Sequence, residues 1–486
     1  MARVAGAVRT GPAGGVRDGR RARRRILIIV QNLPVPLDRR VWLECQALRA
    51  AGYYPSVISI RGAQDVAYEE LEGVHIYRYK PARPARGALG YAWEFAYSWA
   101  RTALLSTRIA RRHGFDAIQA CNPPDTFWAL AALYKPFGKR FVYDQHDLNP
   151  EVFVSRFGTK LGLAGRLQYR ALLWLERMTY KLADHVISTN ESYRHVALQR
   201  GGLASDQVTV VRSGPNTSLM RPVDGRPELR KGRAHLAVYL GIMGPQDGVD
   251  IAIRALDVYV RELGRSDLHL ALLGFGDCFD ELKQLAGDLG LDDYVTFTGR
   301  ADAKMITEYL STADIGISPD PLNPLNDVST MNKTMEYMAF ALPVVAFDLK
   351  ETRVSAAEAA VYVEPGDIAG YAKAIAALLD DPDARAAMAI AGRQRAADVL
   401  DWEPQRASYV GVYDKLLRGS SSGDKSPQTP QWPDVDRRVQ DSKSLVDRFG
   451  NRMVDLRRPN VVNRFVRTRR LLDDNALPSS ETEAAE

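Results

Sequence analysis

The stretch NDVSTMNKTMEYMAFALPVVAF, residues Asn326–Phe347, places a short helix directly before an apolar strand. Asn332, or the pair Ser329 and Thr330, is expected to cap the helix. The unpaired N–H groups of its first turn and the positive end of its dipole then form an anion site, to which Lys333 adds a charge. The start of this helix is therefore a candidate phosphate site.

A carboxylate lies on the same face of this helix. Glu336 follows Lys333 by three residues, and a carboxylate there can accept hydrogen bonds from a vicinal diol such as a ribose. Pro343 ends the helix, and Val344–Phe347 reads as a strand buried on both faces, as parallel strands usually are. The stretch therefore predicts a nucleotide site in an α/β protein, with an ordinary surface ion pair as the alternative.

Composition narrows the class of protein. The chain has 486 residues, of which 46% are hydrophobic and 26% charged, as in a soluble protein of two domains. Its 65 Lys and Arg only modestly exceed its 59 Asp and Glu, so nucleic-acid binding is not indicated. Three scattered cysteines indicate a reducing cytoplasm, with neither disulfides nor a metal site. No run approaches the ~18 apolar residues of a membrane span.

Short apolar runs alternate with amphipathic segments, which is typical of parallel sheets with helices on both faces. The strands expected in the first half are Ile26–Val30, Ser56–Ile60, Val74–Tyr79, Ala117–Cys121, Arg140–Tyr143, His185–Thr189 and Val208–Val211. Those expected in the second half are Leu236–Leu240, Leu268–Leu273, Val295–Thr298, Ile315–Ser318, Val344–Phe347 and Val361–Val363. Gly241 and Gly244 form a strand-to-helix turn at the start of the second series. Two Rossmann-like units facing a cleft are therefore expected.

The chain divides accordingly into six parts. They are a basic disordered tail at 1–25, a first Rossmann-like domain at 26–215, a linker at 216–233, a second Rossmann-like domain at 234–400, a helix crossing back at 401–417 and a low-order, Arg-rich tail at 418–486. The last tail reads either as a basic amphipathic helix for anionic lipid or a partner, or as a solvated segment.

Four motifs carry a resemblance to a known family. They are DRRVWLECQALRAAGY at Asp38–Tyr53, YDQHDLNPE at Tyr143–Glu151, YLGIMGPQDGVD at Tyr239–Asp250 and NKTMEYMAFALPVV at Asn332–Val345. With these motifs in this order, the chain resembles a bacterial glycosyltransferase of family four. The resemblance implies the GT-B fold and a nucleotide-diphosphate sugar as donor. It also implies a glycan or lipid-linked acceptor on the first domain, transfer with retention of configuration, and a role in surface polysaccharide or glycolipid assembly.

The resemblance assigns roles to individual residues. Glu336 corresponds to the second glutamate of a paired-glutamate motif and is expected to hold the ribose, whereas the first glutamate falls at Val328 and is missing. His146 matches the family's active-site histidine beside the transferred sugar, and Asp147 is expected to orient its imidazole. Without the resemblance, a histidine in a loop is more often a surface residue.

The family's diphosphate site is also altered. Its Arg and Lys fall at Ile242 and Asp247, and losing two such cations would cost roughly 10² to 10⁴-fold in donor binding or rate. Lys333 is expected to replace them, with glycines letting the backbone approach the phosphates. The donor-binding candidates are Gly241, Gly244, Arg300, Ser329, Thr330, Asn332, Lys333 and Glu336. The catalytic candidates are His146, Asp147 and Lys333, and no metal or cofactor is expected.

The acceptor side is less specific. The segment 122–125 either lines it or forms a turn before a helix. Aromatic and Arg residues that either face a lipid-linked acceptor or pack in the core are Trp93, Phe95, Tyr97, Trp99, Arg101, Arg108, Arg111 and Arg112. We expect a cytoplasmic protein that contacts the inner face of the plasma membrane. Two alternatives remain, a hydrolysing nucleotide-sugar epimerase of the same fold and a catalytically degenerate partner subunit.

Overall fold

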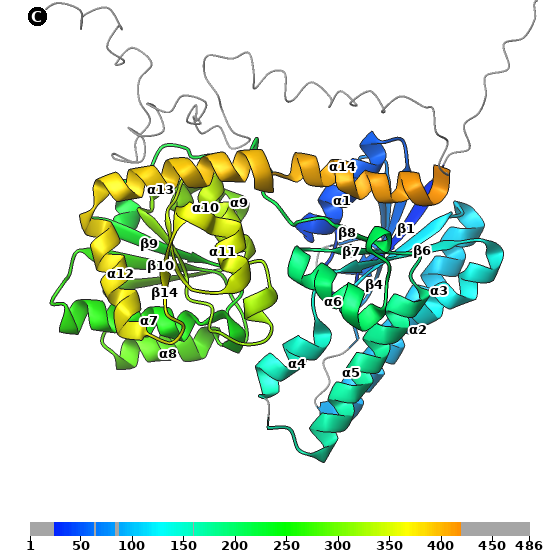
Figure 1. Ribbon diagram of the computed structural model, residues 1–486, viewed down its shortest axis with the longest axis horizontal. Coiled ribbons are helices and arrows are strands. Elements are labelled where there is room, and N and C mark those ends of the chain that lie inside the picture. The colour runs from blue at the N-terminus through cyan, green and yellow to red at the C-terminus, as the bar shows by residue number, and fades with distance from the viewer. Residues whose placement is uncertain (1–23, 63–64, 83–86, 159, 419–486) are drawn as a thin grey trace, which may run out of the picture.

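The computed structural model describes residues 24–418, with gaps at 63–64, 83–86 and 159 (Figure 1). The predictions for the two tails concern residues that lie outside this range, apart from the innermost ones. The described chain forms two α/β units, each built on one sheet with helices on both faces. The expected α/β class with two Rossmann-like domains is confirmed. The domain and linker boundaries given above stay predictions.

The first sheet has eight strands in the order β3-β4-β2-β1-β5-β6-β7-β8. Its strands are β1 (Arg25–Ile29), β2 (Tyr54–Ile60), β3 (Tyr68–Leu71), β4 (Val74–Tyr79), β5 (Ala117–Cys121), β6 (Arg140–Gln145), β7 (His185–Ser188) and β8 (Val208–Val210). Every neighbouring pair is parallel except β3 with β4. Strand β3 was not predicted, because its sequence YEEL is largely polar, as suits an edge strand.

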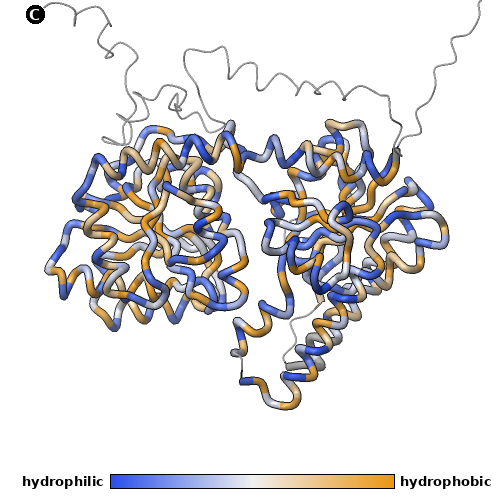
Figure 2. Tube along the Cα trace, viewed as in Figure 1, coloured by the Kyte–Doolittle hydropathy of each residue, from blue (hydrophilic) through white to orange (hydrophobic). Residues whose placement is uncertain are grey.

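Helices cover both faces of this sheet. They are α1 (Arg39–Ala50), α2 (Gly87–Arg112), α3 (Trp128–Tyr134), α4 (Asn149–Phe157), α5 (Leu163–Leu182) and α6 (Glu191–Gly201). Successive side chains of β1 point to opposite faces of the sheet. Ile26 and Ile28 pack in a cluster with residues of α1, and Leu27 and Ile29 pack in a second cluster on the other face. The hydrophobic interior and the polar exterior of both units are visible in Figure 2.

The second sheet has six parallel strands in the order β11-β10-β9-β12-β13-β14. Its strands are β9 (His235–Leu240), β10 (Leu268–Leu273), β11 (Val295–Gly299), β12 (Ile315–Ser318), β13 (Val344–Phe347) and β14 (Ala360–Val363). Its helices are α7 (Val249–Asp257), α8 (Phe279–Asp288), α9 (Ala303–Thr312), α10 (Asn332–Ala339), α11 (Lys350–Ala356), α12 (Ile368–Asp380) and α13 (Pro382–Arg395). Strand β13 is fully buried between β12 and β14, as its apolar sequence predicted.

The last described α-helix, α14 (Trp402–Tyr413), extends from the α13 side over the first unit (Figure 1). Trp402, Tyr409 and Tyr413 are buried in the same cluster as Val41 and Cys45 of α1. The core of the first unit is therefore completed by residues that follow the whole second unit in sequence.

The strand orders locate the places where ligands bind in such sheets. The order reverses between β1 and β5 in the first sheet, and between β9 and β12 in the second. Ligands of open α/β sheets bind beyond the carboxyl ends of the strands at such switch points. The residues that follow these four strands are therefore the candidates for a functional site.

Candidate functional site

His146 directly follows β6 and is held by a buried carboxylate. Its Nε2 lies 2.9 Å from Oδ2 of Asp144, which has no exposed surface. Arg40, near the start of α1, donates from Nη2 to the other oxygen, Oδ1 of Asp144, at 2.9 Å. Burial alone would raise the pKa of Asp144, but the charges of Arg40 and His146 outweigh it and lower that pKa.

Arg40 also contacts the histidine directly. Its Nε donates to Nε2 of His146 at 3.1 Å and lies at the same distance from Oε1 of Glu44, with which it forms an ion pair. Nε2 of His146 is therefore held between the Arg40 guanidinium and the Asp144 carboxylate. The expectation that Asp147 orients the ring is wrong, because the carboxylate in contact with Nε2 of His146 is that of Asp144, near the end of the buried strand β6.

A buried glutamine extends this network to the end of the chain. Gln119 Nε2 donates to Asp144 Oδ2 at 2.8 Å and to Glu44 Oε2 at 2.7 Å. Its Oε1 accepts hydrogen bonds from the hydroxyls of Tyr409 and Tyr413 on α14. Hydrogen bonds therefore connect α14 to the carboxylate that holds His146.

The same strands bring three potential metal ligands together. Ligand atoms of Cys121, Asp144 and His146 lie within 4.8 Å of one another, which the expectation of no metal site at the cysteines did not foresee. Burial strongly raises the pKa of the Cys121 thiol, while a metal needs the thiolate. The guanidinium of Arg40 already supplies a cation to Asp144. The chemistry of this group therefore fits a buried ion-pair network better than a metal centre.

The loop after β6 is clamped from β5. Asn122 Oδ1 accepts hydrogen bonds from the backbone N–H groups of His146 at 2.7 Å and Asp147 at 3.1 Å, and Nδ2 donates to the carbonyl of Asp147. Asp125 accepts from the hydroxyl of Tyr143. Asn122 and Asp125 are 2% and 4% exposed. These two side chains of segment 122–125 thus position the histidine loop, in keeping with the turn interpretation.

In the second unit, Lys333 is at the second position of α10. It forms a buried ion pair with Asp320, two residues beyond the end of β12, and its Nζ lies 5.1 Å from the centre of the Tyr239 ring. A Cβ on Gly241 would lie 3.5 Å from Cε of Lys333, so the glycine turn and the lysine are neighbours. Lys333 is 8% exposed. The predicted mobile cation is therefore a buried and paired one.

The predicted cap of α10 is wrong. The residue before the helix is Met331, which provides no side-chain cap, and Asn332 is exposed in the first turn. The hydroxyls of Ser329 and Thr330 are used elsewhere. Tyr193 OH donates to Ser329 Oγ at 2.8 Å, and Asn190 Nδ2 donates to Thr330 Oγ1 at 3.0 Å. Both partners belong to the first unit, so this segment joins the two units instead of capping the helix.

Asp247, at the place of the family's lysine, faces the glycine turn. Its Oδ2 accepts the backbone N–H of Gly244 at 2.8 Å. Burial raises the pKa of Asp247, and the charge of Lys333 opposes that rise. The N–H of Gly244 is thus taken up by Asp247, contrary to the expectation that this glycine leaves its backbone open to a phosphate.

Val328, at the place of the missing glutamate, lies in an apolar contact between the units. It packs against a small cluster of Leu148, Tyr193 and Leu325, and its carbonyl accepts a hydrogen bond from Asn190. A glutamate here would place a carboxylate among apolar side chains. This apolar packing suits a valine where the family pattern has a glutamate.

Glu336 is bound across the two units. Its Oε1 forms an ion pair with Arg39, the first residue of α1, whose side chain is 52% exposed. The next residue, Arg40, holds Asp144 and His146. Two consecutive arginines therefore contact the two residues predicted from separate motifs. Arg39 pairs with Glu336, the carboxylate expected to bind the ribose, and Arg40 contacts His146. Arg300 lies apart from this group, exposed just beyond β11 and 5.2 Å from the centre of the Phe275 ring.

Four members of the site were not assigned from the sequence. They are Arg39, Arg40, Gln119 and Asp144. Two signals could have found them. The first is the pair of arginines, Arg39 and Arg40, at the start of the helix after β1. The second is the polar residues inside otherwise apolar strands, because a buried charge needs a partner.

Two family models match the chain. The model described as Glycosyltransferase Family 4 matches residues 37–219, and the one described as Glycosyl transferases group 1 matches residues 234–381. The first match covers α1 and the histidine loop, and the second covers the glycine turn and α10.

Curated relatives include a glycogen synthase of Mycobacterium tuberculosis, 28% identical over 283 residues, which are 58% of this chain and 64% of the relative. A GDP-mannose-dependent alpha-(1-6)-phosphatidylinositol monomannoside mannosyltransferase of Mycolicibacterium smegmatis is 31% identical over 193 residues, 38% of this chain and 50% of the relative. The chain thus spans half to two thirds of the length of these relatives.

Solved structures share the fold. Sucrose-phosphate synthase of Thermosynechococcus elongatus superposes with a TM-score of 0.68 and 19% identity, covering 82% of this chain and 100% of the other. Anabaena Alr3699/HepE in complex with UDP-glucose gives a TM-score of 0.59 and 18% identity, covering 80% of this chain and 99% of the other. At these identities the likeness concerns the arrangement of the two units.

Proposed function

Because the chain belongs to the family four glycosyltransferases of GT-B fold, we propose that it transfers a sugar from a nucleotide-diphosphate sugar to a glycan or lipid-linked acceptor. One observation carries the proposal. Arg39 contacts Glu336 of the second unit, while Arg40 holds Asp144 and His146 of the first. The proposed ribose site and the proposed sugar site are thereby brought to one junction.

The donor is proposed to bind against α10 and the glycine turn. Glu336 accepts the ribose hydroxyls, and Lys333 with the first turn of α10 faces the diphosphate. Because Lys333 is already paired with Asp320, its net contribution is smaller than that of a free cation.

Arg39 supplies the more accessible charge. A ribose that takes Glu336 frees the guanidinium of Arg39, and the diphosphate joins the same ribose at its 5′ side. We therefore assign to Arg39, together with Lys333, the charge lost at Ile242 and Asp247.

The chemistry proposed is retaining and metal-independent. The anomeric C–O bond breaks through an oxocarbenium-like state while negative charge grows on the leaving diphosphate, which fixed cations and helix N–H groups stabilise. The leaving phosphate itself takes the proton of the attacking acceptor hydroxyl. His146, fixed by Asp144, is placed beside the transferred sugar.

Donor consumption by the purified protein tests the proposal and its two alternatives. Nucleotide release that requires a membrane extract as acceptor supports transfer, whereas epimerisation without acceptor supports the hydrolysing epimerase. No turnover with any nucleotide sugar in a donor panel supports the degenerate subunit. Thermal shift with the panel identifies the donor first, since a ligand at 100 times its Kd adds about 2.7 kcal/mol.

Variants locate the diphosphate site. Arg39→Ala and Lys333→Ala are each expected to weaken nucleoside-diphosphate binding by about 10-fold or more, since a hydrogen bond to a charged group contributes roughly 1.5–3 kcal/mol. Arg353→Ala, which removes another exposed Arg from a surface pair with Asp348, is the control. Binding that is unchanged or tighter in Arg39→Ala would mean that Arg39 only holds the two units together through Glu336 and does not bind the diphosphate.

Contact with an anionic membrane at the inner face of the plasma membrane is also proposed. Among the described residues, none of the helices combines the length and apolarity of a membrane span. Around the α4–α5 connection, however, Phe157, Leu163 and Leu167 are 65%, 88% and 71% exposed. Exposed cations in the same region are Lys160, Arg166 and Arg170. Apolar side chains interleaved with cations fit a surface of anionic lipid.

Sedimentation with vesicles tests the membrane contact. The wild type is expected to bind vesicles of phosphatidylcholine with phosphatidylglycerol and to lose that binding in Leu163→Asp/Leu167→Asp. A variant that binds as well as the wild type would remove this surface from the proposal.

A further inference from the structure

The amino edge of the first sheet carries a basic pocket that the proposed reaction does not use. Its cavity of about 260 Å³ is lined by Arg25, Arg49, Arg112, His75 and His113, with Glu70 at one side. Arg25 begins β1, and His113 lies between α2 and the start of β5. His146 follows the carboxyl end of β6, so the pocket and the proposed active site lie at opposite ends of the parallel strands of the first sheet.

Within the described residues, the arginines of this pocket, Arg25, Arg49 and Arg112, form no ion pair with a carboxylate. Arg112 lies over the Tyr68 ring at 5.5 Å and Arg49 over the Tyr54 ring at 5.2 Å. Nε of Arg49 is buried and finds no acceptor among the described residues, while Nη1 donates to the carbonyl of Tyr53 at 3.4 Å. A buried guanidinium N–H without an acceptor is costly unless a ligand supplies one.

Two glycines make room for the guanidinium groups. A Cβ on Gly73 would lie 2.4 Å from Nη2 of Arg49, and one on Gly114 would lie 3.1 Å from Nη1 of Arg25. Gly73 and Gly114 both have positive φ, 76° and 72°. A larger residue at 73 would be strained by the positive φ and would displace the end of the Arg49 side chain.

The two histidines complete the polar lining. Their rings stack with centroids 4.1 Å apart. His113 Nε2 is hydrogen-bonded to Tyr77 OH, while His75 Nδ1 faces Tyr68 OH at 3.2 Å and Glu70 at 3.6 Å. Burial, His75, Arg112 and Arg25 lower the pKa of His113. A bound anion would offset the last three of these effects.

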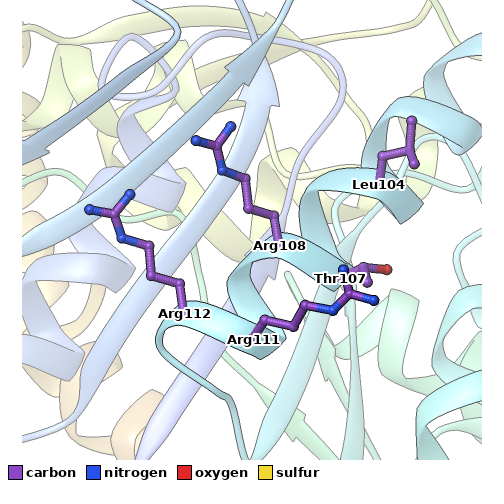
Figure 3. A pocket seen from close by; sticks show the side chains of 5 residues that line it. All are labelled: Leu104, Thr107, Arg108, Arg111 and Arg112. Atoms are coloured by element: carbon purple, nitrogen blue, oxygen red, sulfur yellow. The ribbon is translucent and has the colours of Figure 1, made fainter.

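The basic lining continues along α2. Leu104, Thr107, Arg108 and Arg111 line an adjoining groove of about 570 Å³ that shares Arg112 with the pocket. Figure 3 shows Arg108 and Arg112 extending in the same direction from the helix, while Arg111 turns toward Thr107. None of these three arginines has a carboxylate partner within the described residues.

The geometry points to a phosphate-binding site at the amino edge of the first sheet, formed by Arg25, Arg49 and Arg112 with His75 and His113. Guanidinium groups bind phosphate oxygens in pairs, and three of them match a phosphate monoester dianion. The cavity is smaller than those that hold whole cofactors, so it takes one phosphate group with a small substituent. Orthophosphate and a phospholipid headgroup both present this chemistry.

Calorimetric titration of the full chain with orthophosphate tests the site. The wild type is expected to bind, Arg112→Gln to bind about tenfold more weakly, and Arg111→Gln, changed one position away, to bind as the wild type. Lys333→Ala, altered at the proposed donor site, should also retain this binding. Loss in Lys333→Ala with retention in Arg112→Gln, or no binding by the wild type, would overturn the proposal.

A second readout reports on the pocket itself. In spectra of histidine-labelled protein, orthophosphate is expected to raise the titration midpoint of His113 in the wild type and not in Arg112→Gln. An unchanged midpoint in the wild type contradicts the site even if phosphate binds elsewhere. Vesicles of phosphatidylcholine with phosphatidic acid identify the source, because a headgroup ligand makes their binding sensitive to Arg112→Gln and a soluble ligand does not.

Discussion

Replacing Asp144 with asparagine should destabilise the first unit more than any single surface change. The carboxylate is wholly buried, accepts hydrogen bonds from Arg40 and Gln119, and lies 2.9 Å from Nε2 of His146. Asparagine keeps one of the two acceptor oxygens and places an NH₂ group where the other oxygen faced a donor. The side chain of Arg40, which is 8% exposed, then has Glu44 as its remaining carboxylate partner.

The size of the destabilisation by Asp144→Asn depends on the partners that Arg40 keeps. Breaking a buried ion pair costs about 3–5 kcal/mol, and the low end applies because Arg40 keeps Glu44, the Val211 carbonyl and Ser213 Oγ. At about 2–4 °C per kcal/mol for a unit of this size, Tm should fall by about 6–12 °C. The control Asp348→Asn breaks a surface pair with Arg353 and should cost less than about 1 kcal/mol.

The effect should also depend on pH. Because the pKa of Asp144 is lowered on folding, its contribution is complete above the unfolded value of about 3.9 and is lost as the pH falls further. Urea unfolding, followed by circular dichroism, should therefore show a full difference between Asp144→Asn and wild type at neutral pH and a smaller one below about pH 4. A neutral-pH difference within about 0.5 kcal/mol would refute the network as a source of stability.

Three further changes test other parts of the structure. Val328→Glu should lower Tm without improving donor turnover, since the carboxylate enters an apolar contact with Leu148 and Tyr193; restored turnover would contradict this. Gly274→Ala should weaken donor binding and cost more than about 1 kcal/mol, because φ is 150° and the new Cβ would lie 1.8 Å from the carbonyl of Gly241; unaltered nucleotide titration would argue against it. Burial lowers the pKa of His269 to about 4, so stability should fall as the pH drops from about 6.5 to 4, and a flat wild-type profile, or one that His269→Gln leaves unaltered, would disprove the assignment.

Much of the fold could be predicted because its signals are local. Strand β13 is a continuous apolar run, and β10 is interrupted only by His269. Helix α1 begins directly after Asp38, whose residue type favours the N-cap position that it occupies. The one missed strand, β3, forms an antiparallel edge, where burial does not impose an apolar pattern. Parallel strands that pair in a sheet are separated in sequence by a helix. The alternation of strands and helices along the chain was therefore enough to predict parallel sheets.

The candidate site could be predicted only in its separate pieces. Glu336 and His146 were found on motifs, but their partners Arg39 and Asp144 come from other elements and depend on how the two units meet. The wrong cap of α10 has the same origin. Ser329 is a good capping residue by type, yet its hydroxyl is taken by Tyr193, some 136 residues earlier in the chain.

The position of α14 has a consequence for synthesis on the ribosome. The nascent first unit has all its strands once β8 has emerged, but the sites on α1 that receive Trp402 and Tyr413, and the acceptor Oε1 of Gln119, stay uncovered until the chain is translated to its last described helix. At roughly 5–20 residues per second, the intervening ~200 residues take about 10–40 s. During that time the amino-terminal unit is a folding intermediate with an exposed apolar face, so a stop codon before α14 would release a chain that chaperones and proteases recognise, even though every proposed catalytic residue has been made.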